Sequence, residues 1–236
     1  MIAHETAKEP GVWLQSVPGE TAFVRAQQRF GSELASIQYP AGYRSDLKGT
    51  LERRAVLAML DELPPGGHIL DCPCGTGRVM QLLLDRQFRV TAADCSEHMV
   101  ERCRNNMLSA NSHLSGRMTF GVEDVLATSY ADASFDGVIC NRLLHHYDDG
   151  ATRVAVLREL ARVSRGPVIV SFTDALSVSA TRKRVKARLL RRTCSKLPTR
   201  AQLAREFAAA GMTCIRTVPV MWGLSRMCYM AGMPKR

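Results

Sequence analysis

Two glycines and two carboxylates in the first half of the chain have the spacing of a nucleoside-binding site. An apolar run ends at Asp71 and breaks into a turn containing Gly75 and Gly77, where a backbone without Cβ atoms can approach a ligand closely. The next apolar run ends at Asp94, 17 residues after Gly77, where a carboxylate can accept hydrogen bonds from both ribose hydroxyls. Apolar residues at helical spacing follow Gly77, so the free N–H groups of a helix N-terminus should face the ligand.

The turn favours a nucleoside that carries no phosphate chain. NAD-binding turns need Gly or Ala at the position of Met80, so that the helix packs closely beside the pyrophosphate. The phosphate loop G-x-x-x-x-G-K-[ST] is absent from the sequence. Dinucleotides and nucleoside triphosphates are therefore disfavoured as ligands.

Three stretches together resemble the class I S-adenosylmethionine-dependent methyltransferases. LDCPCGTGR (70–78) is similar to the family's first motif, D-x-G-x-G-x-G, and TAADCSEHMV (91–100) to its second strand with the ribose acid. VEDVLATSYADASFDGVICNRLLHHYDD (122–149) is similar to the stretch that holds the adenine. The resemblance covers roughly residues 51–170 and departs at Pro73, which occupies the first glycine position of the first motif.

This resemblance implies S-adenosylmethionine as the cofactor and a set of residues around it. Asp94 is expected at the ribose, Asp124 at the adenine amino group, and the Val125 amide at the adenine ring. An alternative role for Asp124 is that of a helix N-cap. The complete implied set is Asp71, Pro73, Cys74, Gly75, Gly77, Arg78, Asp94, Cys95, Asp124, Val125 and Asn141.

His145 and His146 follow the fourth expected strand and are the candidate catalytic residues. Methyl transfer from a sulfonium disperses positive charge, so alignment of the reactants matters most and a base is needed only for a protonated nucleophile. A neutral imidazole suits a hydroxyl or ammonium acceptor. His145 is preferred because it lies nearer the strand. The alternative is that one histidine packs under the cofactor and the other caps the next helical region with Asp148.

The net charge of +10 is concentrated near the C-terminal third, with nine Lys or Arg and no Asp or Glu between Thr181 and Arg200. Residues 182–192 predict a basic amphipathic helix, since Thr181, Val185 and Leu189 form a narrow stripe. In the resembled family such an insertion forms part of the acceptor site. Here it could meet a phosphate, a carboxylate or a membrane surface, with Arg188 and Arg192 best placed. The alternative is a solvated lid.

Strands and helices alternate after the glycine turn, which predicts an α/β fold. We expect a Rossmann-like doubly wound, mostly parallel seven-stranded sheet with an antiparallel C-terminal hairpin and an N-terminal helical cap. Acids and Asn141 that follow the strands should converge at the carboxyl edge. The expected strands after the turn are 88–93, 118–122, 135–140, 167–172, 212–220 and 225–233, and the expected helices are 20–38, 48–63, 96–109, 151–164 and 201–210.

The length suits one domain with four parts. We assign a helical cap (1–63), a cofactor-binding core (64–173), a basic helical insertion (174–200), and a terminal helix with the hairpin (201–236). Tyr43 and Arg44, between the two leading helices, are candidate substrate residues in the acceptor cleft.

Eight cysteines form no C-x-x-C pair and no framework of a small secreted protein. They indicate reduced thiols and do not favour a metal site. The sequence shows neither a membrane-spanning apolar run nor a signal-peptide core at its start, so we expect a cytoplasmic enzyme.

The sequence therefore predicts a class I methyltransferase acting on a small or lipid-like acceptor, anionic acceptors included, at oxygen rather than nitrogen or carbon. One alternative is a nucleic-acid (RNA) methyltransferase that uses the basic segment. It is disfavoured because residues 141–144 replace the N-P-P-Y signature of adenine and glutamine N-methyltransferases and the segment lacks interleaved aromatic residues. A second alternative is a non-catalytic, cofactor-binding regulatory subunit.

Overall fold

A seven-stranded sheet in the order β3-β2-β1-β4-β5-β7-β6 forms the centre of the protein. The computed structural model describes residues 46–190, 196–221 and 227–235. The strands are β1 His68–Asp71, β2 Arg89–Asp94, β3 Met118–Val122, β4 Gly137–Cys140, β5 Val168–Thr173, β6 Met212–Pro219 and β7 Met227–Pro234. Strands β1 to β5 pair in parallel, whereas β7 is antiparallel to both β5 and β6. The predicted Rossmann-like sheet and its antiparallel hairpin are confirmed.

All described α-helices except α4, which begins after Gly77, start where a polar side chain caps a free N–H group. Ser96 accepts a hydrogen bond from Met99 N at the start of α5, and Thr199 with Gln202 forms a capping box at α8. The helices are α3 Leu47–Leu60, α4 Arg78–Asp85, α5 Glu97–Ala110, α6 Gly150–Val163, α7 Val178–Leu189 and α8 Arg200–Ala209, with short 3₁₀ turns at Ser112–Arg117 (η1) and Leu144–His146 (η2). The expected helix 20–38 lies outside the described residues.

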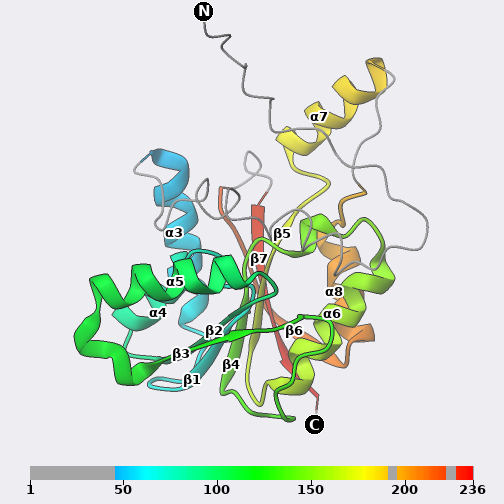
Figure 1. The fold of residues 1–236 in the computed structure, drawn as a ribbon. Helices are drawn as coiled ribbons and strands as arrows, with labels where there is room; N and C mark the ends of the chain where they lie inside the picture. Colours follow the sequence, from blue (N-terminus) through cyan, green and yellow to red (C-terminus); the bar gives the residue numbers. More distant parts are fainter. Residues whose placement is uncertain (1–45, 191–195, 222–226, 236) are drawn as a thin grey trace, which may run out of the picture.

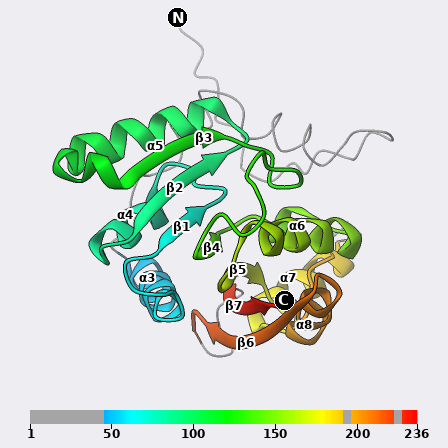
Figure 2. The ribbon, with the colours of Figure 1, turned by 90° about the horizontal axis from the view of Figure 1, so that it is seen from below.

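Helices cover both faces of the sheet, which explains why its central strands are apolar throughout (Figures 1 and 2). On one face α3 and α4 pack over a core that includes Ile69 and Ile139. On the other face α6 and α8 pack over Leu70 and Val138. Successive residues of one strand therefore belong to different cores.

Strand β4 is shorter than the sequence predicted. Phe135 forms only an isolated parallel bridge with Ser164, and the carboxylate of Asp136 accepts a hydrogen bond from the His68 N–H at 2.8 Å. Phe135 and Asp136 thus lie at the amino edge of the parallel strands, before β4 begins. None of the helices in the described part of the chain is long and apolar enough to cross a membrane.

Candidate cofactor and acceptor site

The glycine-rich turn joins β1 to α4 and is fixed against the neighbouring strand. The Cys74 N–H donates to the Ala93 carbonyl at 2.8 Å, and the Gly77 N–H donates to the Cys74 carbonyl at 3.0 Å. The Cys72–Pro73 peptide bond, at the position where the sequence departs from the family motif, is cis. The two backbone hydrogen bonds fix the turn before α4 although a proline replaces the first glycine of the motif.

The two glycines serve different purposes. Gly77 has a φ of 93°, and a Cβ there would lie 3.0 Å from the Cys103 sulfur and from the Met107 methyl group, so only glycine lets the turn pack on α5. Gly75 has a φ of 52°, but a Cβ there would meet no atom within 4 Å. The backbone at Gly75 consequently borders open space.

Asp94, at the end of β2, is buried and holds this turn in place. Its carboxylate accepts hydrogen bonds from the Gly75 N–H at 3.0 Å and the Ser96 N–H at 3.1 Å. Burial raises the pKa of Asp94, although these hydrogen bonds oppose the shift. The neighbouring Cys95 thiol is half-buried, and burial together with the Asp94 charge raises the pKa of Cys95 to about 12. The thiol is therefore neutral at physiological pH.

Asp71 is a fully buried acid at the carboxyl end of β1, and neither of its carboxylate oxygens has a hydrogen-bond partner among the described residues. Burial, followed by repulsion from Asp94, raises the pKa of Asp71 well above its ordinary value. The Met80 amide opposes this shift but does not reach hydrogen-bond geometry. A buried carboxylate without a partner is costly, so a cationic or hydrogen-donating ligand group beside it would be stabilised. These residues thus suit the positively charged end of S-adenosylmethionine.

The strand register brings the predicted site residues to one edge. Asp71 lies beside Ala92 of β2 and Ile139 of β4, so Asp94 and Asn141 each follow two residues further along. The Glu123 N–H donates to the Asp94 carbonyl at 3.0 Å, which places the loop after β3 beside the end of β2.

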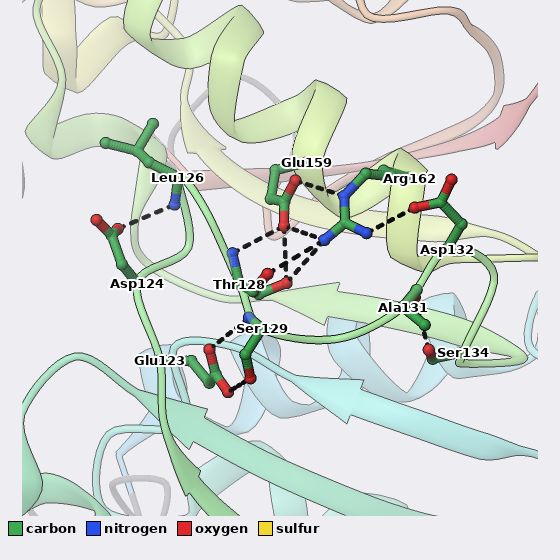
Figure 3. Close-up of polar contacts among 10 residues, drawn as sticks. All are labelled: Glu123, Asp124, Leu126, Thr128, Ser129, Ala131, Asp132, Ser134, Glu159 and Arg162. Atoms are coloured by element: carbon green, nitrogen blue, oxygen red, sulfur yellow. Dashed lines mark hydrogen bonds and ion pairs between the residues drawn. The ribbon is translucent and has the colours of Figure 1, made fainter.

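Asp124 lies in that loop, next to the buried Val125. Its carboxylate accepts a hydrogen bond from the Leu126 N–H at 2.9 Å and so closes a tight turn (Figure 3). No described helix begins at this position, so the helix-cap alternative is wrong. The nearby Glu123 carboxylate binds Ser129, which folds the loop back on itself.

The same loop is attached to α6 through Glu159 (Figure 3). This carboxylate accepts hydrogen bonds from Thr128 N and Oγ1 at 2.8 and 2.7 Å. Arg162 donates to Glu159 and also to Asp132, at 2.7 Å for the latter. Burial raises the pKa of Glu159, but the bonds from Arg162 and Thr128 outweigh it, so that the pKa is lowered. The loop that carries Asp124 is therefore attached to the end of β2 through the Glu123 N–H and to α6 through Glu159.

Asn141 and Arg142 follow β4 and are fixed by different partners. Asn141 is buried, and its side-chain oxygen accepts a hydrogen bond from the Tyr229 hydroxyl of β7 at 3.0 Å. Arg142 has a φ of 60°, and its N–H donates to the Ser171 hydroxyl at 2.6 Å. The backbone thus turns away from the sheet directly after the strand.

Glu52 of α3 completes an ion cluster that sequence reasoning missed. Its carboxylate accepts hydrogen bonds from Arg142 Nε at 2.9 Å and Nη2 at 2.5 Å, and it lies 3.8 Å from Arg78 Nη1. Arg78, a predicted cofactor residue, is thereby linked to the leading helix. One signal was present in the sequence: Glu52 is an acid at the same helical face as Val56 and Leu60, both of them buried.

His145 and His146 lie in η2, on the carboxyl side of β4 where the sequence predicted them. Both side chains are half-buried, and their ring centroids are 4.0 Å apart. The helix that follows is capped by Asp149, which accepts a hydrogen bond from Thr152 N at 2.7 Å. Asp148 instead accepts one from the Lys196 N–H at 3.2 Å. Capping of α6 therefore leaves both imidazoles to other roles.

The candidate acceptor residues are only partly described. Arg188 is exposed near the end of α7, which begins four residues before the predicted basic helix and ends at Leu189. Tyr43, Arg44 and Arg192 lie outside the described residues. The seven described cysteines are free thiols.

Residues 69–166 match a protein-family model described as "Methyltransferase domain". The 27-O-demethylrifamycin SV methyltransferase of Amycolatopsis mediterranei is 34% identical over 143 residues, covering 58% of this chain and 51% of that protein. The human "Probable tRNA methyltransferase 9B" is 31% identical over 123 residues, covering 52% of this chain and 24% of that protein. The chain thus spans about half the length, or less, of these relatives.

Among solved structures, the magnesium protoporphyrin IX methyltransferase from Synechocystis PCC 6803 with bound SAH has a TM-score of 0.74 to this chain. The two share 19% identity over 90% of this chain and 99% of that one. An O-methyltransferase from neocarzinostatin biosynthesis has a TM-score of 0.62 and 22% identity over 80% of this chain and 56% of that one. At these identities the likeness concerns the fold.

Proposed function

We propose that the chain is a class I S-adenosylmethionine-dependent methyltransferase, as its match to the methyltransferase-domain model over residues 69–166 supports, and that it transfers a methyl group from this cofactor to the oxygen of a small or lipid-like acceptor. The observation that carries the proposal is the glycine-rich turn after β1, which combines a buried Asp71 carboxylate without a hydrogen-bond partner among the described residues with open space at the Gly75 backbone. A cationic nucleoside satisfies both features. A nucleoside triphosphate carries only negative charge beyond its ribose, and Met80 stands where an NAD-binding turn requires Gly or Ala.

Different residues at the carboxyl edge of the sheet would bind different parts of the cofactor. Asp94, already held by the Gly75 and Ser96 amides, would accept hydrogen bonds from the ribose hydroxyls with its remaining lone pairs. Asp124 and the Val125 amide would hold the adenine. Asp71 would oppose the positive charge of the methionine end. Bound there, S-adenosylmethionine supplies an electrophilic methyl group on a sulfonium.

His145 is the proposed base that removes the proton of a hydroxyl acceptor, with His146 as the second candidate. Its position directly after β4 supports this role, because the acceptor must approach over the carboxyl edge of the sheet. A neutral imidazole there would take the proton as the oxygen attacks. The relative that acts on a 27-O-demethylrifamycin, according to its name, supports an oxygen acceptor.

Calorimetry on the purified chain tests the cofactor part of the proposal. S-adenosylmethionine and S-adenosylhomocysteine should bind more tightly than NAD. Asp94→Ala should lose about 2 to 3 kcal/mol of binding free energy, the value of hydrogen bonds to a charged group. Asp61→Ala, at an exposed ion pair with Arg86, is the matched control and should bind normally. Equal or tighter NAD binding, or unchanged cofactor binding by Asp94→Ala, would overturn the assignment.

Methyl transfer to RNA is the second candidate function. Two observations favour it: the similarity to a protein named as a probable tRNA methyltransferase, and the net charge of +10. Labelled S-adenosylmethionine should be offered with phenolic and carboxylate acceptors and, in parallel, with tRNA. Turnover on tRNA alone would replace the small-acceptor proposal. Cofactor binding without turnover on any acceptor would favour a regulatory subunit.

A further inference from the structure

Helix α7 presents its apolar stripe to the outside. Val178, Val185 and Leu189 are 49%, 52% and 78% exposed, whereas Ala180 is buried. At about 100° per residue, the three exposed side chains fall within a sector of roughly 40°, and Ala180 lies on the other side of the helix. A surface helix of a globular protein normally turns such a stripe toward the core. In α7 the orientation is reversed.

Positive charge lies on both sides of this outward stripe. Arg182 and Lys186 follow it on one side, and Arg184 and Arg188 on the other, by the same helical spacing. All four side chains are exposed. The sequence contains no Asp or Glu from Ala175 to Arg205, so no acid of this segment offsets the charge.

The base of α7 is firmly attached while the helix itself projects. Ser177 caps it, and the buried Asp174 just before it accepts a hydrogen bond from Arg200 at 2.8 Å. The Ala175 N–H donates to the Pro198 carbonyl at 3.0 Å. Figure 1 shows α7 (yellow) standing away from the sheet beyond β5. Because α7 follows the carboxyl end of β5, it lies at the same edge of the sheet as the candidate site.

We infer that α7 is a docking helix for an anionic membrane surface. Val178, Val185 and Leu189 enter the boundary between headgroups and acyl chains, and the flanking cations contact lipid phosphates. A nucleic acid would use the cations but would gain nothing from three exposed aliphatic side chains. Single-stranded nucleic acids are bound with aromatic side chains on which successive bases stack, and no Phe, Tyr or Trp occurs between Phe172 and Phe207.

Docking through α7 would hold the carboxyl edge of the sheet toward the bilayer. An acceptor dissolved in or anchored to the membrane would then reach the site without crossing bulk water. The docking itself requires neither cofactor nor turnover, so it is tested separately from the methyltransferase proposal.

Co-sedimentation of the full chain with vesicles tests the docking. Vesicles of phosphatidylcholine mixed with phosphatidylglycerol should bind the chain, and pure phosphatidylcholine should bind it weakly. Arg182→Gln with Lys186→Gln should weaken the partition coefficient about 25-fold, roughly fivefold for each charge. Val185→Ser with Leu189→Ser should weaken it about tenfold or more.

Two control variants carry the same substitutions elsewhere. Arg102→Gln with Arg205→Gln changes exposed cations on α5 and α8, and Leu108→Ser with Ile215→Ser changes exposed apolar residues on α5 and β6. Both should bind vesicles as the native chain does. Losses of equal size in the controls, or no loss in the α7 variants, would overturn the proposal. Tight tRNA binding that depends on Arg182 and Lys186, but not on Val185 and Leu189, would assign α7 to RNA instead.

Discussion

Replacing Glu52 by alanine should destabilise the carboxyl edge of the sheet, because this carboxylate serves two arginines. The Glu52 side chain is 4% exposed, against 36% for Arg142 and 15% for Arg78. It accepts two hydrogen bonds from Arg142 and lies 3.8 Å from Arg78. The variant leaves two guanidinium groups near each other without the acid they share. Helix α3 also loses its ionic attachment to α4 and to the residues that follow β4.

The expected magnitude lies between two limits. Removing one partner of a fully buried ion pair costs about 3 to 5 kcal/mol, and removing one partner of an exposed pair costs about 1 kcal/mol or less. Glu52 is buried, but solvent reaches Arg142 and screens part of the interaction. We therefore expect a loss of about 2 to 3 kcal/mol in the free energy of unfolding.

Urea unfolding measures this loss, and Glu62→Ala is the matched control. Glu62 lies just after α3 and pairs with Arg216 at 2.7 Å, but the two side chains are 26% and 39% exposed. Its removal should cost about 1 kcal/mol or less. If Glu52→Ala lost no more stability than Glu62→Ala, the cluster would be an ordinary surface pair and the proposed attachment of α3 would be refuted.

Three further changes test other parts of the site. Asp71→Asn should bind S-adenosylmethionine more weakly yet stabilise the free protein. Because the pKa of Asp71 is raised in the folded state, native stability falls as pH rises from the unfolded pKa toward the folded pKa. Unfolding at several pH values should show that the variant lacks this fall. Gly77→Ala should cost about 2 kcal/mol or more in unfolding free energy, since φ is 93° and the new Cβ lies 3.0 Å from two side-chain atoms. The control Gly116→Ala places a Cβ that meets no atom within 4 Å and should cost little. Once a hydroxyl acceptor is known, His145→Asn should reduce the rate about a hundredfold and flatten the rise of rate with pH, with His146→Asn as the comparison; an unchanged profile would assign His145 to packing.

The sequence predicted the local features of the site because short-range physics determines them. Asp71 and Asp94 each end an apolar run, and a parallel sheet has to bring such ends to one edge. Ser96 begins α5 because its hydroxyl satisfies a free N–H of the first turn. These relations join residues that are close in sequence or in adjacent strands. Periodicity and side-chain chemistry are therefore sufficient to predict these local features.

Long-range partners and orientation could not be predicted in the same way. Glu52 and Arg142 are 90 residues apart, and their pairing depends on how α3 crosses the sheet. The stripe of Val185 and Leu189 was visible in the sequence, but periodicity identifies a face and not the side toward which it turns. The predicted start of β4 at Phe135 was wrong for a similar reason, because the Asp136 side chain accepts a hydrogen bond from the His68 N–H and the strand begins only at Gly137.

The attachments of α3 and α7 to the carboxyl edge differ in a way that suits different tasks. A buried carboxylate holds α3 to α4 and to the residues after β4, so motion of α3 would break this ion cluster and cost about 2 to 3 kcal/mol. Helix α7 is held at its base by Asp174, Arg200 and Pro198, and most of its length is exposed. A cofactor site needs fixed walls, since misplacement of the methyl group lowers the rate. A docking helix needs an accessible surface. Variants of Glu52 should therefore affect stability, and variants along α7 should affect partner binding while leaving the unfolding free energy nearly unchanged.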